Sequence, residues 1–405
     1  MMTATANIEK IEIPSAASSE LRGRDILCFS HDWSGDPLSK THLMRVLAKD
    51  NRILWINAIA NRMPTASSHD ASRILKKIKS FTEPIREVEP NIFVLNPLAF
   101  PSYGNRSILK VNQAFLASQV KKAMGRLGFK NAVNMIFNPA AGMIAGRVGE
   151  SEIVYYCVDE YTAFTGASRG LKQIEDDLFR RADLVVVSAE RLFESKKHLN
   201  PNTVVIRHGT DWRHFRAALD STLAIPAEIA NLPRPIIGFH GLLADWVDYD
   251  LIKKVAQHFS KGSVVLIGKV APDAEQKIKI LDDVPNIHLL GRKPYAELPA
   301  YCKAFDVALN PFSINELTLA ANPLKVREYL AAGLPVVSTD IPEVRILDNC
   351  AIASDATDFI NKIEYVLENP QPRETISDHI AKESWEAKVD DLRSVVEKWR
   401  HEKTW

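Results

Sequence analysis

The sequence has few cysteines, no long apolar run and almost no net charge, and each absence excludes a class of protein. Its 4 cysteines stand at positions 28, 157, 302 and 350. This scatter has neither metal-ligand spacing nor a disulfide framework, which favours a reducing cytoplasm. No segment approaches the roughly 18 uninterrupted apolar residues of a membrane-spanning helix. With 51 basic and 50 acidic residues, the global charge offers no argument for nucleic acid binding.

Length and composition favour a globular protein with two domains. A chain of 405 residues with 46% hydrophobic and 25% charged content can bury a core in each of two domains. Residues 1–22 lack an apolar centre, so we predict a disordered tail rather than a signal peptide or membrane span. The stretch Trp212–Arg234, with two prolines, is the candidate linker. We therefore predict domains over 23–212 and 213–375.

Apolar runs alternate with helical patterns along most of the chain. Ile26–Phe29 is followed by a helical pattern over Ser39–Lys49 and by a second apolar run, Ile53–Ile56, and a similar series begins at Pro235. This alternation is typical of parallel, doubly wound sheets. The sequence thus predicts an α/β fold of two Rossmann-like domains facing a cleft, with ligand sites at the carboxyl ends of the strands.

The most informative stretch is 322–338. Pro323 suits a first helical position, and Gly333 suits a left-handed cap before an apolar strand. The helix start leaves backbone N–H groups unpaired beside Lys325, which together suit a diphosphate. Glu328 lies one turn further on the same face, where its carboxylate can accept hydrogen bonds from two sugar hydroxyls. An ordinary helix with a surface Lys–Glu pair is the alternative.

Two polar segments in the first half follow apolar strands, at the edge where open α/β sheets bind ligands. His31, Asp32 and Trp33 follow the first strand and are candidates for acceptor binding. A polar turn that caps the next helix is the alternative. Asp159 follows the strand Ile153–Val158 and is expected to face the same crevice, unless it caps a helix.

Glycines and a pair of acids mark the second series. Gly238 and Gly241 allow the backbone to approach a ligand, and the next strand ends at Gly268 and Lys269. The run Asp248-Tyr249-Asp250 matches a D-x-D metal motif. We reject that interpretation because the acids stand where a helix begins and complement its dipole. The sequence therefore predicts no metal.

One short segment, Arg73–Phe81, combines apolar residues at helical spacing with a basic face. Such a face suits peripheral contact with an anionic membrane. We favour a solvated surface helix because the segment is short.

The run Pro323–Val337 closely resembles the donor-site segment of the GT-B glycosyltransferases, in particular the group 1 enzymes that make exopolysaccharides and teichuronic acid. The resemblance extends from Arg24 to about Leu367 and is strongest over Ile236–Val337. It implies the GT-B fold, in which the C-terminal stretch 376–405 returns to the first domain. In that family the Glu of this motif holds the nucleotide ribose, a role that transfers to Glu328.

The resemblance also implies the chemistry. The donor is a UDP- or GDP-sugar without metal or other cofactor, and a lipid-linked or oligosaccharide acceptor receives the sugar at the cytoplasmic membrane face during surface polysaccharide biosynthesis. Asp159 is the expected base, and Lys325 opposes the charge of the leaving diphosphate. Arg292 and its neighbour read the nucleobase edge. The implied donor-binding residues are Gly238, His240, Gly241, Gly268, Lys269, Arg292, Asn322, Leu324, Lys325 and Glu328.

One position departs from the family. Relatives often carry two glutamates eight positions apart, the first near the donor sugar, but Ala320 stands eight positions before Glu328. We therefore assign the donor hydroxyl contacts to the backbone or to Asn322, and favour inversion of the anomeric centre. Two rival functions remain open: a nucleotide-sugar epimerase of the same fold, and a non-catalytic partner subunit, for which Ala320 is the best hint.

Overall fold

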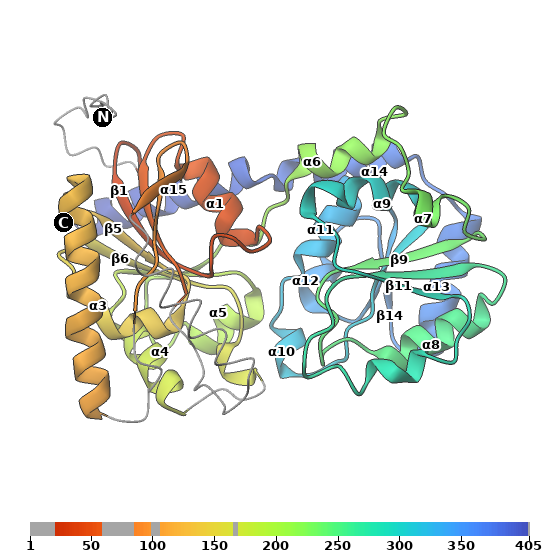
Figure 1. Ribbon diagram of the computed structural model, residues 1–405, viewed down its shortest axis with the longest axis horizontal. Coiled ribbons are helices and arrows are strands. Elements are labelled where there is room, and N and C mark those ends of the chain that lie inside the picture. The colour runs from red at the N-terminus through yellow and green to blue at the C-terminus, as the bar shows by residue number, and fades with distance from the viewer. Residues whose placement is uncertain (1–20, 59–84, 99–105, 165–168, 404–405) are drawn as a thin grey trace, which may run out of the picture.

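The computed structural model describes residues 21–58, 85–98, 106–164 and 169–403, which form two α/β domains side by side (Figure 1). Each domain is built on a mostly parallel sheet with helices on both faces. The fold class predicted from the alternation of apolar and helical runs is confirmed. The segments 1–20 and Arg73–Phe81 lie outside the described residues.

The sheet of the first domain, as far as the structure describes it, has eight strands in the order β3-β4-β2-β1-β5-β6-β7-β8. They are parallel except β3, which runs antiparallel to β4 at one edge. The strands are β1 (Asp25–Phe29), β2 (Arg52–Ile56), β3 (Arg86–Glu89), β4 (Ile92–Leu95), β5 (Val133–Ile136), β6 (Glu152–Cys157), β7 (Leu184–Val187) and β8 (Thr203–Val205). The central strand β1 is buried along its whole length.

Successive residues of β1 point to opposite faces of this sheet and so belong to two core clusters. Leu27 and Phe29 belong to the cluster that α3, α4 and the 3-10 helix η1 cover. Ile26 and Cys28 belong to the cluster that α1 and α15 cover. The helices are α1 (Ser39–Leu47), α3 (Arg106–Leu127), η1 (Pro139–Ile144), α4 (Arg169–Arg181), α5 (Glu190–Lys196) and α15 (Trp385–Lys403).

The described part of the second domain contains a six-stranded sheet in the order β11-β10-β9-β12-β13-β14, and its strand pairs are parallel. Its strands are β9 (Ile236–His240), β10 (Ser263–Ile267), β11 (Ile287–Gly291), β12 (Val307–Asn310), β13 (Val336–Thr339) and β14 (Cys350–Ala353). Its helices are α6 (Trp212–Arg216), α7 (Ala227–Ala230), α8 (Tyr249–His258), α9 (Leu298–Ala304), α10 (Glu316–Leu319), α11 (Leu324–Ala331), α12 (Pro342–Arg345), α13 (Ala356–Glu368) and α14 (Arg373–Ile380).

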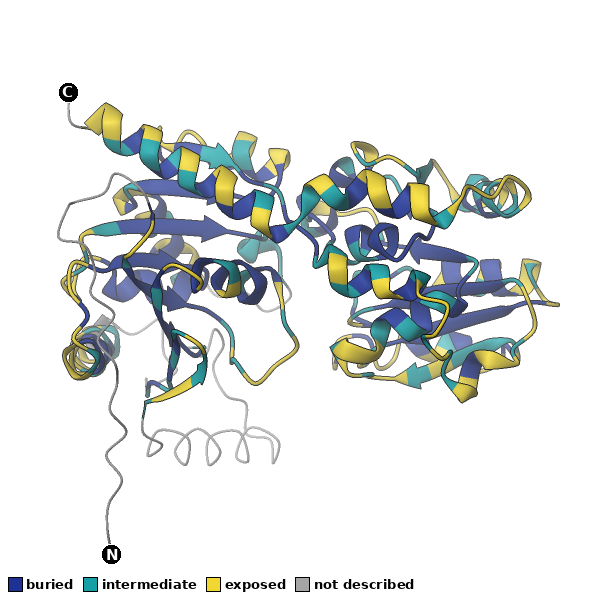
Figure 2. Ribbon diagram, turned by 90° about the horizontal axis from the view of Figure 1, so that it is seen from above, coloured by how far each residue is buried: buried dark blue, intermediate teal, exposed yellow. Residues whose placement is uncertain are grey.

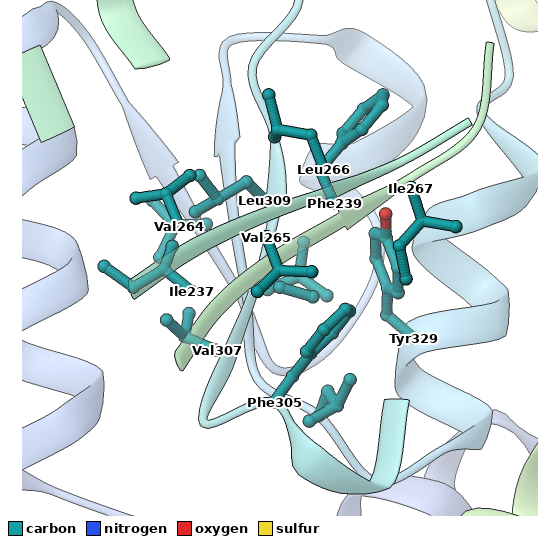
Figure 3. Close-up of a cluster of buried hydrophobic side chains, with 14 of the residues drawn as sticks. Ile237, Phe239, Val264, Val265, Leu266, Ile267, Phe305, Val307, Leu309 and Tyr329 are labelled. Atoms are coloured by element: carbon teal, nitrogen blue, oxygen red, sulfur yellow. The ribbon is translucent and has the colours of Figure 1, made fainter. Parts of the chain in front are cut away.

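The core of the second domain lies between this sheet and its helices. Phe305 and Tyr329 pack against the aliphatic side chains of β9, β10 and β12 (Figure 3). Gly238 lies inside β9, where an added Cβ would come within 2.0 Å of the Phe305 ring. This glycine therefore serves close packing in the core, and the structure does not place it in the cleft as the resemblance implied.

Helix α15 carries the end of the chain back across the first domain (Figures 1 and 2). Its buried residues Val389 and Leu392 join the cluster beneath α1. Arg400 forms an ion pair with Glu152 at 2.7 Å. The second domain is therefore linked to the first both by the segment before α6 and by the segment before α15.

Helix α11 begins and ends almost where the sequence predicted. Gly333 follows it with φ 73°, which confirms the left-handed cap. Pro323 is the N-cap rather than the first helical residue, because its ψ of 113° is extended. No helix among the described residues is long and apolar enough to cross a membrane.

Candidate active site

A cleft with a volume of about 450 Å³ lies between the two domains. Residues that follow β1 and β6 form one wall, and residues that follow β9, β10 and β11 face them. Of the residues singled out from the sequence, the cleft lining brings together Asp159, His240, Gly241, Gly268, Lys269, Arg292, Asn322, Leu324, Lys325 and Glu328. The lining also includes Asp36, Lys40, His208 and Tyr295, for which the sequence pattern predicts no role.

Two glycines allow the strand ends to meet at one wall. Gly241 and Gly268 have φ values of 136° and 157°. An added Cβ at Gly268 would lie 1.8 Å from the Gly241 carbonyl oxygen, and one at Gly241 would lie 2.9 Å from Nζ of Lys325. The two glycines therefore bring the backbone and Lys325 into direct contact, where a ligand can reach both.

Lys325 and Glu328 lie one turn apart at the start of α11. Nζ of Lys325 is 4.6 Å from the centre of the Phe239 ring and 4.5 Å from that of Phe312. Burial lowers the pKa of Lys325 to about 8, an effect that Glu328 opposes. Burial likewise raises the pKa of Glu328 to about 7, against the effect of Lys325. Both groups have lost water without full compensation, so a ligand that offers negative charge and hydroxyls would stabilise them.

Three buried polar atoms in the cleft lining have no hydrogen-bond partner among the described residues: Nε2 of His208, Nε2 of His240 and Oη of Tyr295. Such atoms cost about 1 to 3 kcal/mol each when they stay unpaired. Nε2 of His240 lies 3.8 Å from Oε2 of Glu328. Burial lowers the pKa of His240 to about 3, so its ring is neutral. The wall therefore presents unused donors and acceptors to a polar ligand.

Tyr329 holds the end of β9 against α11. Its hydroxyl accepts a hydrogen bond from the backbone N–H of His240 at 2.7 Å and donates to the carbonyl of the same residue at 3.1 Å. Because Tyr329 follows Glu328 directly, this contact fixes the carboxylate relative to the strand ends.

Asp159 and Lys40 form a second lysine–carboxyl pair, on the first domain. Asp159 follows β6, and Lys40 lies in the first turn of α1. Burial raises the pKa of Asp159 to about 6, and the positive charge of Lys40 opposes that shift. Burial lowers the pKa of Lys40, and Asp159 opposes that change. A carboxylate with a pKa near 6 is suited to accept a proton at neutral pH.

An ion pair closes the cleft at its rim. Nε and Nη2 of Arg292 donate to the Asp36 carboxylate at 2.8 and 2.5 Å. Both side chains are exposed, and they belong to different domains. In this structure the Arg292 guanidinium thus binds the first domain, which leaves its backbone for the nucleobase contact that the resemblance implies.

Asn322 joins the two domains at the base of the cleft. Its amide nitrogen donates to the Ser188 carbonyl at 2.6 Å, and its amide oxygen accepts from the buried Arg327. The backbone carbonyl oxygen of Asn322 lies 2.9 Å from Nδ1 of His208 and accepts a hydrogen bond from it in the tautomer that carries the proton on Nδ1. The side chain of Asn322 already takes part in this interdomain junction, and its contact with the donor sugar stays a prediction.

Ala320 and Leu324 also touch the first domain. Ala320 is 3% exposed and packs in the cluster that contains Leu27 and Phe29. Leu324 packs against the cluster beneath α1. A carboxylate at position 320 would lose its water in this apolar contact, so alanine fits the interface better than the glutamate of relatives.

The side chains of the predicted acceptor loop, residues 31–33, contact neighbouring segments of the first domain. His31 lies within hydrogen-bond distance of Ser30 and Thr41, at 3.1 and 3.3 Å. Trp33 packs edge-on against Trp55, with ring centres 4.9 Å apart. Asp32 accepts a hydrogen bond from the backbone of residue 58 at 3.2 Å. The cleft lining does not include these three residues, and their acceptor role stays a prediction.

The acids of the D-x-D run begin a helix, as predicted. Asp248 is the N-cap of α8, and its side chain accepts a hydrogen bond from the Leu251 N–H at 2.8 Å. Within the described segments no group of three His, Cys, Asp or Glu side chains is placed to hold a metal ion.

Comparisons with known proteins agree with this geometry. Residues 234–369 match the family model described as glycosyl transferases group 1. The chain resembles the group 1 glycosyltransferases. A Bacillus subtilis (strain 168) protein named for teichuronic acid biosynthesis, the glycosyltransferase TuaH, is 25% identical over 250 residues. That match covers 56% of this chain and 62% of TuaH, so it spans less than two thirds of the relative.

Solved structures share the arrangement of both domains. Sucrose-phosphate synthase from Thermosynechococcus elongatus has a TM-score of 0.64 at 15% identity, with 94% of this chain and 98% of that chain covered. Anabaena HepE in complex with UDP has a TM-score of 0.59 at 15% identity, with 94% and 99% covered. At these identities the likeness establishes the fold alone, which is GT-B.

Proposed function

We propose that the protein is a glycosyltransferase that moves a hexose from a UDP- or GDP-sugar to a lipid-linked or oligosaccharide acceptor in surface polysaccharide biosynthesis. The group 1 family match of the second domain supports sugar transfer. The name of the Bacillus subtilis relative supports a cell-surface polymer as the product. HepE structures with UDP and with UDP-glucose support a nucleotide-sugar donor.

The observation that carries this proposal is the half-buried pair Lys325 and Glu328 at the start of α11. Lys325 lies against the backbone of Gly241 and beside two aromatic rings. Its ammonium group can oppose the diphosphate that gains charge as the glycosidic bond breaks. Glu328 stands one turn away and can accept hydrogen bonds from the ribose hydroxyls, while the free N–H groups of the helix start contact the phosphates. The groups for charge recognition and for hydroxyl recognition thus lie one helical turn apart in α11.

The opposite wall supplies the group that activates the acceptor. Asp159 takes the proton of the attacking hydroxyl, and its pKa of about 6 leaves it ionised at neutral pH. Lys40 keeps that carboxylate charged inside the cleft. A single displacement from this wall inverts the anomeric centre of the transferred sugar.

The experiment that tests this function measures binding and transfer separately. Calorimetry with UDP, GDP and ADP and their hexose conjugates identifies the donor, and the parent is compared with Glu328→Gln and with Glu316→Gln. Glu316 is an exposed acid at the start of α10, so its variant is the matched control. We expect micromolar to millimolar binding of one diphosphate series, weakened in Glu328→Gln only. Absence of binding in the parent favours the rival of a non-catalytic partner subunit, for which Ala320 is the sequence hint.

Transfer is then followed with and without a lipid-linked oligosaccharide extract. Release of nucleoside diphosphate that depends on the extract supports a transferase. Release of free sugar or nucleotide without any acceptor supports the epimerase instead and contradicts the proposal. Proton NMR of the first product gives the anomer, and an anomer opposite to that of the donor supports Asp159 as the base.

A further inference from the structure

Helix α3 has an unusual charge composition. Its 22 residues, RSILKVNQAFLASQVKKAMGRL, include five basic residues and no acidic one. The whole chain has a net charge of only +1, so this helix is a local excess of positive charge. At 1.5 Å per residue the helix is about 33 Å long.

The two sides of α3 differ sharply. One side carries Leu116, Val120 and Ala123 into the first-domain core. The opposite side faces water, and we call it the α3 outer face. It is formed by four cations, Lys110, Lys121, Lys122 and Arg126, and two apolar residues, Val111 and Phe115.

The cations of the α3 outer face have no acidic partner within the described segments. The other long helix with a water-facing side, α15, is the internal comparison. There Arg393 pairs with Asp50, Arg400 with Glu152 and Lys403 with Asp183. The positive charge of α15 is therefore balanced by acids of the first domain and of the helix itself, whereas that of α3 is directed to the surroundings.

The apolar residues of the α3 outer face are exposed to an unusual degree. Val111 is 54% and Phe115 is 39% exposed, and they stand four residues apart, so their side chains are neighbours on the helix surface. Exposed single hydrophobic residues are common, but here a neighbouring apolar pair shares the outer face with the lysines, a combination that suits a surface with both anionic and apolar parts.

We infer that the α3 outer face docks the protein on a bilayer that contains anionic phospholipids. Lysines and arginine bind the headgroup phosphates, and Phe115 and Val111 enter the boundary below them. A nucleic acid would use the cations but would gain little from the apolar pair, which is why we commit to a lipid surface. The inference rests on the proposed function in that it supplies the surface on which a lipid-linked acceptor resides.

The position of α3 allows such docking without blocking the cleft. The helix stands at the outer edge of the first domain, on the side away from the second domain (Figure 1). The segments that link the two domains, before α6 and before α15, lie away from α3.

Vesicle co-sedimentation of the full chain tests the inference. The vesicles contain either phosphatidylcholine alone or phosphatidylcholine with phosphatidylglycerol. We expect binding to the anionic vesicles, reduced by salt. The double variant Lys121→Gln/Lys122→Gln should bind roughly 25-fold more weakly, at about five-fold per lysine. The matched control, Lys254→Gln/Lys261→Gln, removes two exposed lysines from the second domain and should bind like the parent.

The apolar part is tested by Phe115→Ser, with Ile346→Ser as the control because Ile346 is 56% exposed on the second domain. Weaker vesicle binding of Phe115→Ser, with unchanged binding to the polyanion heparin, supports docking in the interface. Equal binding of the parent to both kinds of vesicle, or parental binding by either α3 variant, would overturn the inference.

Transfer to a water-soluble acceptor analogue separates this inference from the proposed function. If the parent transfers sugar to the analogue but ignores vesicles, the docking fails and the function stands. If the α3 variants bind vesicles more weakly than the parent but the parent transfers no sugar, the function fails and the docking stands.

Discussion

Each wall of the cleft carries one lysine–carboxyl pair, but the two pairs are brought together in different ways. On the second domain, Lys325 and Glu328 are three residues apart in one helix. On the first domain, Lys40 and Asp159 are far apart in the sequence and meet because both follow strands of one sheet. In each pair burial raises the pKa of the carboxyl group, to about 7 for Glu328 and about 6 for Asp159, while the lysine opposes the shift.

The surroundings of the two pairs differ, and this difference assigns their tasks. Lys325 is held between two aromatic rings and against a glycine backbone, a site that a phosphate can approach but that restrains the ammonium group. Lys40 and Asp159 have no side-chain hydrogen bond to the residues described, so Asp159 is free to receive a proton. The second-domain pair therefore suits donor binding and stabilisation of the leaving group, and the first-domain pair suits proton transfer.

The largest expected effect breaks the first-domain pair. Asp159→Asn keeps the shape of the side chain but cannot accept the acceptor proton, so turnover should fall roughly 100- to 10,000-fold. Calorimetry should find donor affinity unchanged, and Asp177→Asn, an exposed acid of α4, is the control. An active Asn variant, together with a product anomer that matches the donor, would remove Asp159 from the base role.

Next in size is the loss of the second-domain cation. Lys325→Met retains an apolar stem between the rings but no charge, so turnover at saturating donor should fall about 100- to 1,000-fold. Binding of an uncharged nucleoside should stay the same, because the base and ribose contacts do not involve the ammonium group. Equal turnover of parent and variant would rule out a role in leaving-group stabilisation.

Loss of the Glu328 carboxyl group should weaken nucleotide binding more than it slows sugar transfer. Glu328→Ala removes two hydrogen bonds from ribose hydroxyls to a charged acceptor, each worth roughly 1.5 to 3 kcal/mol before water compensates. We expect nucleoside diphosphate affinity to fall about 10- to 100-fold, measured by calorimetry. An affinity equal to that of the parent would contradict the ribose assignment.

The second-domain pair could be predicted from the sequence because its geometry is local. Spacing along a helix places Lys325 and Glu328 on one face, and the structure confirms the glycine cap at Gly333. The strand and helix alternation likewise predicts the two sheets, because it reflects which faces are buried.

The first-domain partners could not be predicted in this way. Lys40, Asp36 and His208 enter the cleft only because strand order brings their loops to one edge. Asn322 shows the same limit: its place in the motif suggests a donor contact, but the sequence does not reveal that its amide also joins the two domains. The missing information is pairing between distant segments, which a single sequence does not contain.

A smaller effect shows whether Lys40 sets the pKa of Asp159. Its positive charge favours the ionised carboxylate, so Lys40→Met should raise that pKa further above about 6. The base is active only when deprotonated, so the acid limb of the rate profile should move to higher pH. Each unit of movement lowers the rate about ten-fold below the new pKa and leaves it unchanged well above. A profile with an unmoved acid limb would show that Lys40 does not act on Asp159.

The smallest expected effect concerns the one contact that joins the two walls at the rim. Asp36 and Arg292 are both exposed, and exposed ion pairs contribute little. Asp36→Ala should therefore change kcat/KM for the donor by less than about five-fold, and high salt should remove the difference because it screens the pair. The informative comparison is with Arg292→Ala. If the arginine only holds the rim, both single variants and the double variant should have the same kcat/KM. If the side chain of Arg292 also contacts the nucleobase, Arg292→Ala should lower kcat/KM more than Asp36→Ala does, and the excess loss should differ between UDP- and GDP-linked donors.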